Sequence, residues 1–202
     1  MWRSGLCALL LGVATHVAAF AIPPGQADGV YSVWTRPDGT EEHTMIMNAT
    51  EALLIRSEPH GLGRSLARRD RLASRWAINE GVSCASGQER LDPGDCDAAN
   101  SMLDNQCGNG ATVRMGMDFY SIRNCAVAYF CNFSGYYDAN CDAQTRRDWS
   151  AAITQKCGLY MPGWGRHISN DDGPFSKENN FSYGYENYCH GGNNFCSRGI
   201  KG

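Results

Sequence analysis

Cysteine is absent from residues 22–83, although the whole chain of 202 residues contains ten. No two cysteines are spaced as C-x-x-C, and the closest pairs fit no zinc pattern, so we expect neither a metal site nor another cofactor. Cys7 lies in the apolar stretch at the N-terminus. The other nine lie beyond residue 83, at Cys84, Cys96, Cys107, Cys125, Cys131, Cys141, Cys157, Cys189 and Cys196. The sequence is therefore divided into a cysteine-free segment and a cysteine-rich part.

Long apolar runs are missing after the N-terminus, which excludes a membrane-spanning helix of the usual roughly 18 or more residues. The apolar run Leu6–Ala14 is shorter than this and follows Arg3. Small residues at Val17 and Ala19, or at Ala19 and Ala21, offer two cleavage sites. This layout is typical of a secretory signal peptide. We predict a signal peptide over residues 1–21 and a secreted, extracellular protein.

A large excess of one charge is also missing, because the formal net charge is only -3. Binding to nucleic acid uses a basic stripe that neutralises phosphates, and electrostatic binding to membranes uses a basic cluster. We therefore expect no nucleic-acid partner.

The nine cysteines of the secreted chain predict a disulfide framework, because disulfides persist in oxidising compartments. Nine is odd, so one cysteine is unpaired or bonded to another molecule, and the protein is a monomer or a disulfide-linked dimer. The sequence leaves the pairing open.

The adjacent basic residues Arg68 and Arg69 lie in an exposed type of sequence, rich in Gly, Ser and Arg. Kexin-type proteases of the secretory pathway cut after such pairs, and polar small-residue segments are where nicking concentrates. We predict a propeptide over residues 22–69 and a cysteine-rich secreted domain over residues 70–202. The alternative is an uncut linker or a short helix over 66–76. A second pair, Arg146 and Arg147, falls in a helical pattern and is expected to be a solvated helix face.

The cysteine-free segment has a β-hairpin pattern of its own. Residues 29–35 and 43–47 are strand-like, and the turn residues 37–39 lie between them. We interpret this hairpin as part of a chaperoning or shielding pro-segment. Glycosylation sequons occur at Asn48, Asn132 and Asn180.

The cysteine-rich part alternates helices and strands. Apolar residues recur at helical spacing over 95–107, after the turn and N-cap candidate of residues 93–95, and again from Asp142 to Cys157 before Gly158. Residues 113–119 and 125–131 read as an antiparallel hairpin, with the even-numbered face of the second strand, including Phe130, exposed. Short strands are expected near 164 and over 181–189. The order predicts an α+β two-layer sandwich, an antiparallel sheet packed on two helices and stapled by disulfides.

Four stretches of this part carry a resemblance. They are DCDAANSML (95–103), NCAVAYFCN (124–132), AAITQKCG (151–158) and GWG (163–165). Together with the signal, propeptide and Arg-Arg layout, they resemble fungal small secreted cysteine-rich proteins of the killer-toxin-like and necrosis-inducing effector group. The resemblance implies an α/β-sandwich that acts on another organism by binding, or by perturbing a membrane or channel, without turnover.

Catalytic patterns are weak or missing. G-x-S-x-G does not occur, which argues against a serine hydrolase of the α/β type. The carboxylates of Asp171 and Asp172 are adjacent in a loop and are expected to splay apart. His190 with Glu178, Glu186 and Arg198 is a conceivable ribonuclease set. We predict no catalytic residue.

Aromatic residues gather in the last quarter among Asn and Gly, a composition typical of contact surfaces. We predict binding by Trp164, Tyr183, Tyr185 and Tyr188, with a core role for these rings as the alternative. The expected function is a non-enzymatic effector or toxin whose partner is a host or competitor protein, or a membrane protein. The alternatives are a protein that binds cell-wall glycan and a small ribonuclease-like hydrolase.

Overall fold

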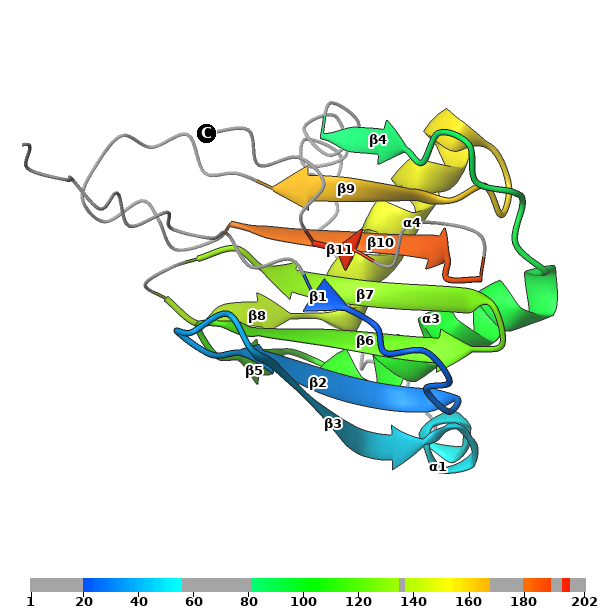
Figure 1. Cartoon of the computed structure of the whole chain (residues 1–202). Helices are drawn as coiled ribbons and strands as arrows, with labels where there is room; N and C mark the ends of the chain where they lie inside the picture. Colours follow the sequence, from blue (N-terminus) through cyan, green and yellow to red (C-terminus); the bar gives the residue numbers. More distant parts are fainter. Residues whose placement is uncertain (1–19, 56–80, 135–136, 168–179, 190–193, 197–202) are drawn as a thin grey trace, which may run out of the picture.

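The computed structural model describes residues 20–55, 81–134, 137–167, 180–189 and 194–196, and this part is built on a seven-stranded sheet (Figure 1). All its strand pairs are antiparallel, in the order β3-β2-β6-β7-β10-β9-β4. The strands are β2 (Gly29–Thr35), β3 (Glu41–Asn48), β4 (Val82–Cys84), β6 (Met117–Arg123), β7 (Ala126–Asn132), β9 (Gly163–His167) and β10 (Phe181–Asn187). Two short ladders join β1 (Phe20–Ala21) to β11 (Asn194–Phe195) and β5 (Ala111–Val113) to β8 (Ala139–Cys141).

The described residues also form three helices, α1 (Ala49–Leu54), α3 (Pro93–Cys107) and α4 (Ala143–Cys157), so the predicted α+β class is confirmed. Helix α3 begins before the predicted residue, because Asp92 is its N-cap and accepts a hydrogen bond from the Asp95 backbone. Proline suits the first position of α3, which needs no hydrogen-bonded N–H. Asp142 caps α4 in the same way, by accepting from the Thr145 backbone.

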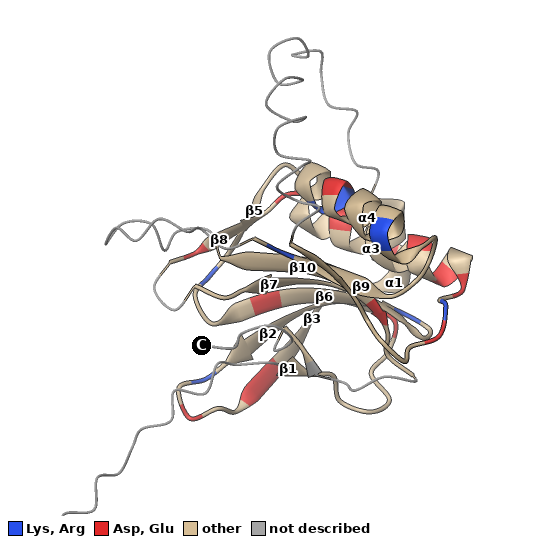
Figure 2. Ribbon diagram, turned by 90° about the horizontal axis from the view of Figure 1, so that it is seen from above, with Lys and Arg blue, Asp and Glu red and all other residues tan. Residues whose placement is uncertain are grey.

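Helices α3 and α4 lie on one side of the sheet and β1 lies on the other (Figure 2). The larger core cluster fills the space between the helices and the sheet, with Leu103, Trp149 and Ile153 from the helices. A Cβ on Gly165 of β9 would lie 1.9 Å from the Trp149 ring, so only glycine allows α4 to approach so closely.

Strand β7 is buried along its whole length, because it lies at the centre of the sheet with layers on both faces. Phe130 belongs to the cluster under the helices, and its neighbour Tyr129 belongs to the cluster on the opposite face. The expected exposure of the even-numbered face, Phe130 included, is therefore wrong. The hairpin of β6 and β7 is confirmed, with its turn at Asn124.

The second face of the sheet is covered by the two ends of the described chain (Figure 1). Phe20 pairs with Phe195 in the β1–β11 ladder, and both rings are completely buried. Together with Ile22 they cover the sheet residues Tyr31 and Tyr120. The fold thus depends on residues from both ends of the described chain.

The cysteine-free segment is an integral part of the sheet. Its predicted hairpin is present as β2 and β3, and β2 also pairs with β6 from Gly29 to Trp34. Val30 and Val33 of β2 are completely buried. Arg68 and Arg69 lie outside the described residues, so cleavage there stays a prediction. In this fold the segment shares one core with the cysteine-rich part.

Four disulfides confirm the predicted framework, and they link Cys84 to Cys157, Cys107 to Cys141, Cys125 to Cys189 and Cys131 to Cys196. Among the described cysteines the unpaired one is Cys96 on α3, which is only 2 % exposed. Burial raises the pKa of its thiol to about 12, which disfavours the reactive thiolate. A disulfide-linked dimer through Cys96 would require α3 to move.

The expectation that Arg146 and Arg147 form a solvated helix face is wrong for Arg146. This guanidinium is buried between α4 and α3, where it forms a two-pronged ion pair with Asp104 and donates to the Asn100 Oδ1 atom over 2.7 Å. Arg147 is partly exposed and lies 3.1 Å from the same carboxylate. A charged residue is buried here because its partner lies on the facing helix.

Candidate functional site

The four aromatic residues predicted to bind do not form one surface. Tyr183 and Tyr185 are 1 % and 3 % exposed and pack under the helices. The Tyr183 hydroxyl accepts a hydrogen bond from the Asp142 backbone over 2.9 Å, so it anchors the start of α4. Trp164 and Tyr188 are partly buried on the opposite face. For Tyr183 and Tyr185 the structure therefore supports the core alternative.

The Asn132 sequon is incompatible with a glycan in this fold, which corrects the prediction. The Asn132 Nδ2 atom donates to the backbone carbonyls of Val113 and Tyr137, each over 3.1 Å, and the side chain is buried. A sugar would replace one of the two N–H donors of this nitrogen and would have no space beside the buried side chain. Asn48, in contrast, is exposed at the start of α1 and caps it through Oδ1, which leaves Nδ2 for a glycan. Asn180 is partly buried.

Three of the four residues of the conceivable ribonuclease set lie outside the described residues, namely Glu178, His190 and Arg198. The adjacent carboxylates of Asp171 and Asp172 also lie outside them. Glu186 is described and is completely buried in β10. Its carboxylate accepts hydrogen bonds from the Tyr129 hydroxyl and the Gln88 amide, each over 2.6 Å. Among the described residues, these two donors hold the Glu186 carboxylate in the interior of the fold.

One grouping of metal-ligating side chains occurs in the described part of the chain, comprising Asp118, Cys131 and Cys196. The two sulfurs form a disulfide and offer no thiolate ligand. Asp118 accepts a hydrogen bond from the Asn132 backbone over 2.7 Å, and burial raises the pKa of its carboxyl to about 8. The grouping does not amount to a metal site.

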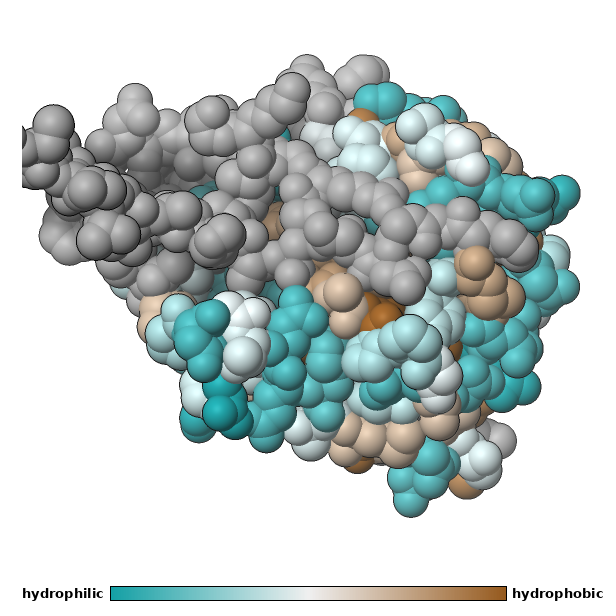
Figure 3. Space-filling model, viewed as in Figure 1, coloured by the Kyte–Doolittle hydropathy of each residue, from teal (hydrophilic) through white to brown (hydrophobic). Residues whose placement is uncertain are grey.

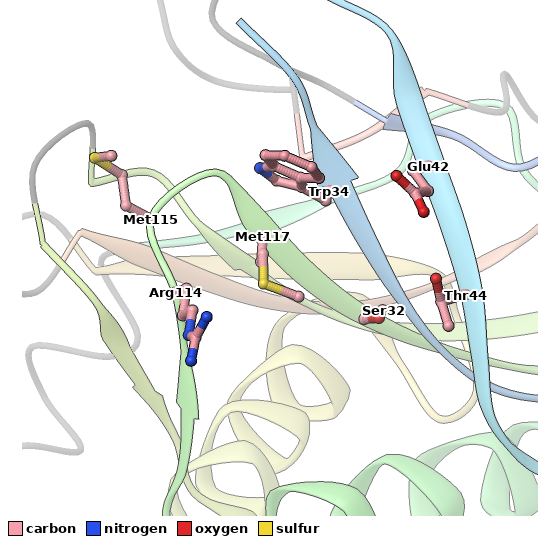
Figure 4. Close-up of a pocket in the computed structure, with 7 residues that line it drawn as sticks. All are labelled: Ser32, Trp34, Glu42, Thr44, Arg114, Met115 and Met117. Carbon is pink, nitrogen blue, oxygen red and sulfur yellow. The ribbon is translucent and has the colours of Figure 1, made fainter.

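A groove of about 480 Å³ lies where the β2–β3 hairpin meets the turn before β6. Its walls come from the β2–β3 hairpin and from residues 114–117, which are distant in the sequence, and Figure 4 shows their side chains around one space. Those side chains are Ser32 and Trp34 from β2, Glu42 and Thr44 from β3, and Arg114, Met115 and Met117 from the turn and β6.

Strand register explains why these residues meet. Trp34 is opposite Glu42 on β3 and opposite Met117 on β6, so all three side chains lie on the same face of the sheet. The predicted continuous strand over 113–119 is interrupted, because Gly116 has a φ of +75° that turns the chain. This turn brings Arg114 and Met115 to the mouth of the groove.

The groove combines apolar contact area with both signs of charge. Trp34 is 44 % exposed and Met115 is 51 % exposed, which is unusual for side chains of this size. The Arg36 guanidinium lies 5.4 Å from the centre of the Trp34 ring and also pairs with Glu42 over 2.6 Å. Trp, Met and Arg are enriched where proteins contact partners, because they offer large adaptable area. The arrangement is suited to binding.

Exposed apolar side chains continue beyond the groove on β3 and α1. Figure 3 shows brown atoms along the lower margin of this face, where these elements lie. We call the following five exposed residues the edge patch: Met45, Ile46, Leu53, Leu54 and Ile55. Among the described residues, Leu159 is the one large exposed apolar side chain that lies outside both the groove and the edge patch.

Sequence reasoning missed the groove because it treated residues 22–69 as a segment to be removed. A signal was nevertheless present. In a strand whose odd-numbered residues Tyr31 and Val33 are apolar, the tryptophan at Trp34 falls on the opposite, partly polar face. A tryptophan on that face marks a contact site more specifically than one in an apolar run.

Within the described residues, no helix has both the length and the apolar character that a bilayer crossing requires. Comparison with protein-family models, with curated protein sequences and with solved structures finds no match for this chain.

Proposed function

We propose that the chain is a secreted, disulfide-rich effector or toxin-like protein that acts by binding a target outside the producing cell. The contact region in this proposal is the groove around Trp34 together with the edge patch on β3 and α1. Four disulfides in the described residues are consistent with an oxidising, extracellular location. The observation that carries the proposal is the concentration of exposed apolar side chains at one edge of the sheet.

The chemistry of the groove favours a protein target, either a host or competitor protein or the external part of a membrane protein. Exposed contiguous apolar surface is uncommon on monomeric proteins and marks interaction sites. Trp and Arg supply most of the binding energy at such interfaces, and here Trp34 and Arg114 line the same groove. We expect a partner that inserts one apolar side chain between Trp34 and Met115.

Paired leaf-infiltration and yeast-growth assays test this function. The Trp34→Ala variant is expected to lose at least about tenfold in potency, because removal of a hot-spot side chain costs about 2 kcal/mol of binding. Leu159→Ala is the matched control, since Leu159 is 57 % exposed and lies outside the contact region. Equal potency of wild type and Trp34→Ala would remove the groove from the proposal, and an inactive wild type would contradict a toxin-like function.

Glycan binding is the second candidate, favoured by one specific observation. Trp34 stands beside the hydroxyls of Ser32 and Thr44 and the carboxylate of Glu42, which combines a stacking ring with hydrogen-bonding groups. Incubation with chitin or β-glucan distinguishes this candidate. Retention of wild type but not of Trp34→Ala on the polysaccharide supports it, whereas degradation of added RNA would indicate the hydrolase alternative.

A further inference from the structure

Phe20 is a core residue, although it lies at the end of the predicted signal peptide. Its ring is completely buried and stacks on Tyr120, with 5.1 Å between the ring centres. The Phe195 ring lies 5.8 Å away, and its backbone pairs with that of Phe20. His43 meets the same ring edge-on at 6.3 Å. A residue enclosed on three sides is expected to remain in the folded protein.

The sequence offers two cleavage sites, after Ala19 and after Ala21, and they differ in whether the mature protein keeps the Phe20 ring. Cleavage after Ala21 removes all of β1 and uncovers the Phe195 and Tyr120 rings. Cleavage after Ala19 keeps β1 complete. We infer that signal peptidase cleaves the Ala19–Phe20 bond, so that the mature protein begins at Phe20. The inference rests on secretion, which is part of the proposed function.

Cleavage at this bond changes the charge beside β3. Hydrolysis consumes one water and leaves a carboxylate on Ala19 and an amine on Phe20, which is largely protonated at neutral pH. The neighbouring Ala21 nitrogen already donates to the Glu41 Oε2 atom over 3.0 Å. Adjacent backbone nitrogens are roughly 3.6 Å apart in an extended chain. The new ammonium nitrogen therefore forms no more than roughly 6.6 Å from this carboxylate oxygen, within the range of an ionic interaction.

Glu41 is placed to receive the ammonium group. Its side chain is only 22 % exposed, and its Oε2 atom also lies 3.3 Å from the His43 Nε2 atom. The His43 Nδ1 atom in turn lies 2.8 Å from the Tyr120 hydroxyl. Maturation therefore adds a cation to a partly buried carboxylate and fastens β1 to β3. We call this interaction between the new N-terminal ammonium group and Glu41 the latch, because it holds β1 over the second face of the sheet.

N-terminal sequencing and intact mass of the secreted full-length protein test the cleavage site. The expected N-terminus is Phe-Ala-Ile-Pro-Pro. A chain that begins at Ile22 would overturn the inference and leave secretion intact. Retention inside the cell with the N-terminal Met1 segment attached would instead contradict the secretion on which the proposed function depends.

The latch has its own test, a double-mutant cycle. Insertion of one glycine between Ala19 and Phe20 displaces the ammonium group, and we expect it to lower the thermal midpoint by about 2–4 °C. The same insertion in Glu41→Gln is expected to have no further effect, because the acceptor charge is absent. Glu42→Gln is the matched control, in which the full shift should persist. An equal shift in Glu41→Gln and Glu42→Gln would refute the latch.

Discussion

Two described regions, which we call the cysteine-free segment (residues 20–55, with no cysteine) and the cysteine-rich part (residue 81 onward, with nine), share one core but are held in different ways. All four disulfides lie within the cysteine-rich part, where they close sequence separations of 34 to 73 residues. The cysteine-free segment is held by the β2–β6 ladder and by burial of side chains such as Tyr31. The cysteine-free segment therefore depends on the folded state of the cysteine-rich part. The cysteine-rich part, in contrast, keeps its disulfide crosslinks even when it is unfolded.

The difference also separates roles. Crosslinks fix the helices and the far strands, whereas the segment without crosslinks presents the edge patch and four of the seven groove residues. Elements with fewer covalent constraints open at lower free energy, and proteins commonly place binding surfaces on such elements. The comparison predicts that disruption of the cysteine-free segment abolishes both the fold and the contact region.

Removal of the cysteine-free segment is expected to have the largest effect. A chain of residues 70–202 loses five large buried side chains: Phe20, Ile22, Val30, Tyr31 and Val33. At about 1.5–3 kcal/mol each, their burial is comparable to the whole stability of about 5–15 kcal/mol of a typical domain. We expect no cooperative unfolding transition in near-ultraviolet circular dichroism, and partial rescue by a peptide of residues 20–55.

Cleavage after Arg69 is expected to leave the fold intact, whereas deletion of the cysteine-free segment is expected to abolish it. No disulfide joins the described residues of the two parts, so a cleaved protein separates into two chains in denaturant without any reductant. Under native conditions the chains are expected to stay together and to elute as one particle. A cysteine-rich chain that is secreted and folded alone would contradict this view of the segment.

Loss of the buried ion pair between α3 and α4 is expected to rank second. If crosslinks alone stabilised the cysteine-rich part, Arg146→Ala would be nearly neutral. We expect it to lower the free energy of unfolding by about 3 kcal/mol, because Asp104 is left buried with weaker compensation. Arg147→Ala, which removes a partly exposed partner of the same carboxylate, should cost less than about 1 kcal/mol in urea unfolding.

The helices and hairpins were predictable, whereas the layers were not. Helix caps and hydrophobic periodicity depend on residues close together in the sequence. Helix α4, which ends before Gly158, and the β6–β7 hairpin were therefore recognisable. Strand order is not local, and the pattern of β7 alone did not reveal that both its faces are covered. Arg146 was misjudged for the same reason, since its partner Asp104 lies 42 residues away.

The groove was the least predictable feature, because its walls converge only after folding. Residues of β2, β3 and the turn at Gly116 meet through strand register and one positive φ angle. Single-sequence reasoning instead emphasised Tyr183 and Tyr185, whose aromatic character serves the core equally well. Composition identified residues suited to binding but could not distinguish a buried ring from an exposed one.

The pH dependence of stability is expected to be a separate effect at the junction of the two parts. Asp118 of β6 is opposite Val33 of β2, and burial raises the pKa of its carboxyl to about 8. The folded state then binds more protons than the unfolded state between pH about 4 and about 8, so stability falls as pH rises through this window. Asp118→Asn should flatten this slope in urea titrations, and an unchanged slope would assign it to other groups.

Trp34→Ala is expected to change stability least and binding most. Since 44 % of Trp34 is already exposed, its truncation removes little buried area, and we expect a loss below about 1 kcal/mol in unfolding. Val33→Ala, one residue away on the buried face, should cost about 2 kcal/mol or more but leave the groove residues in place. Potency measured at a temperature where both variants are folded should then fall for Trp34→Ala alone. A parallel fall in both variants would mean that potency follows stability, and that the cysteine-free segment serves the fold without making the contact.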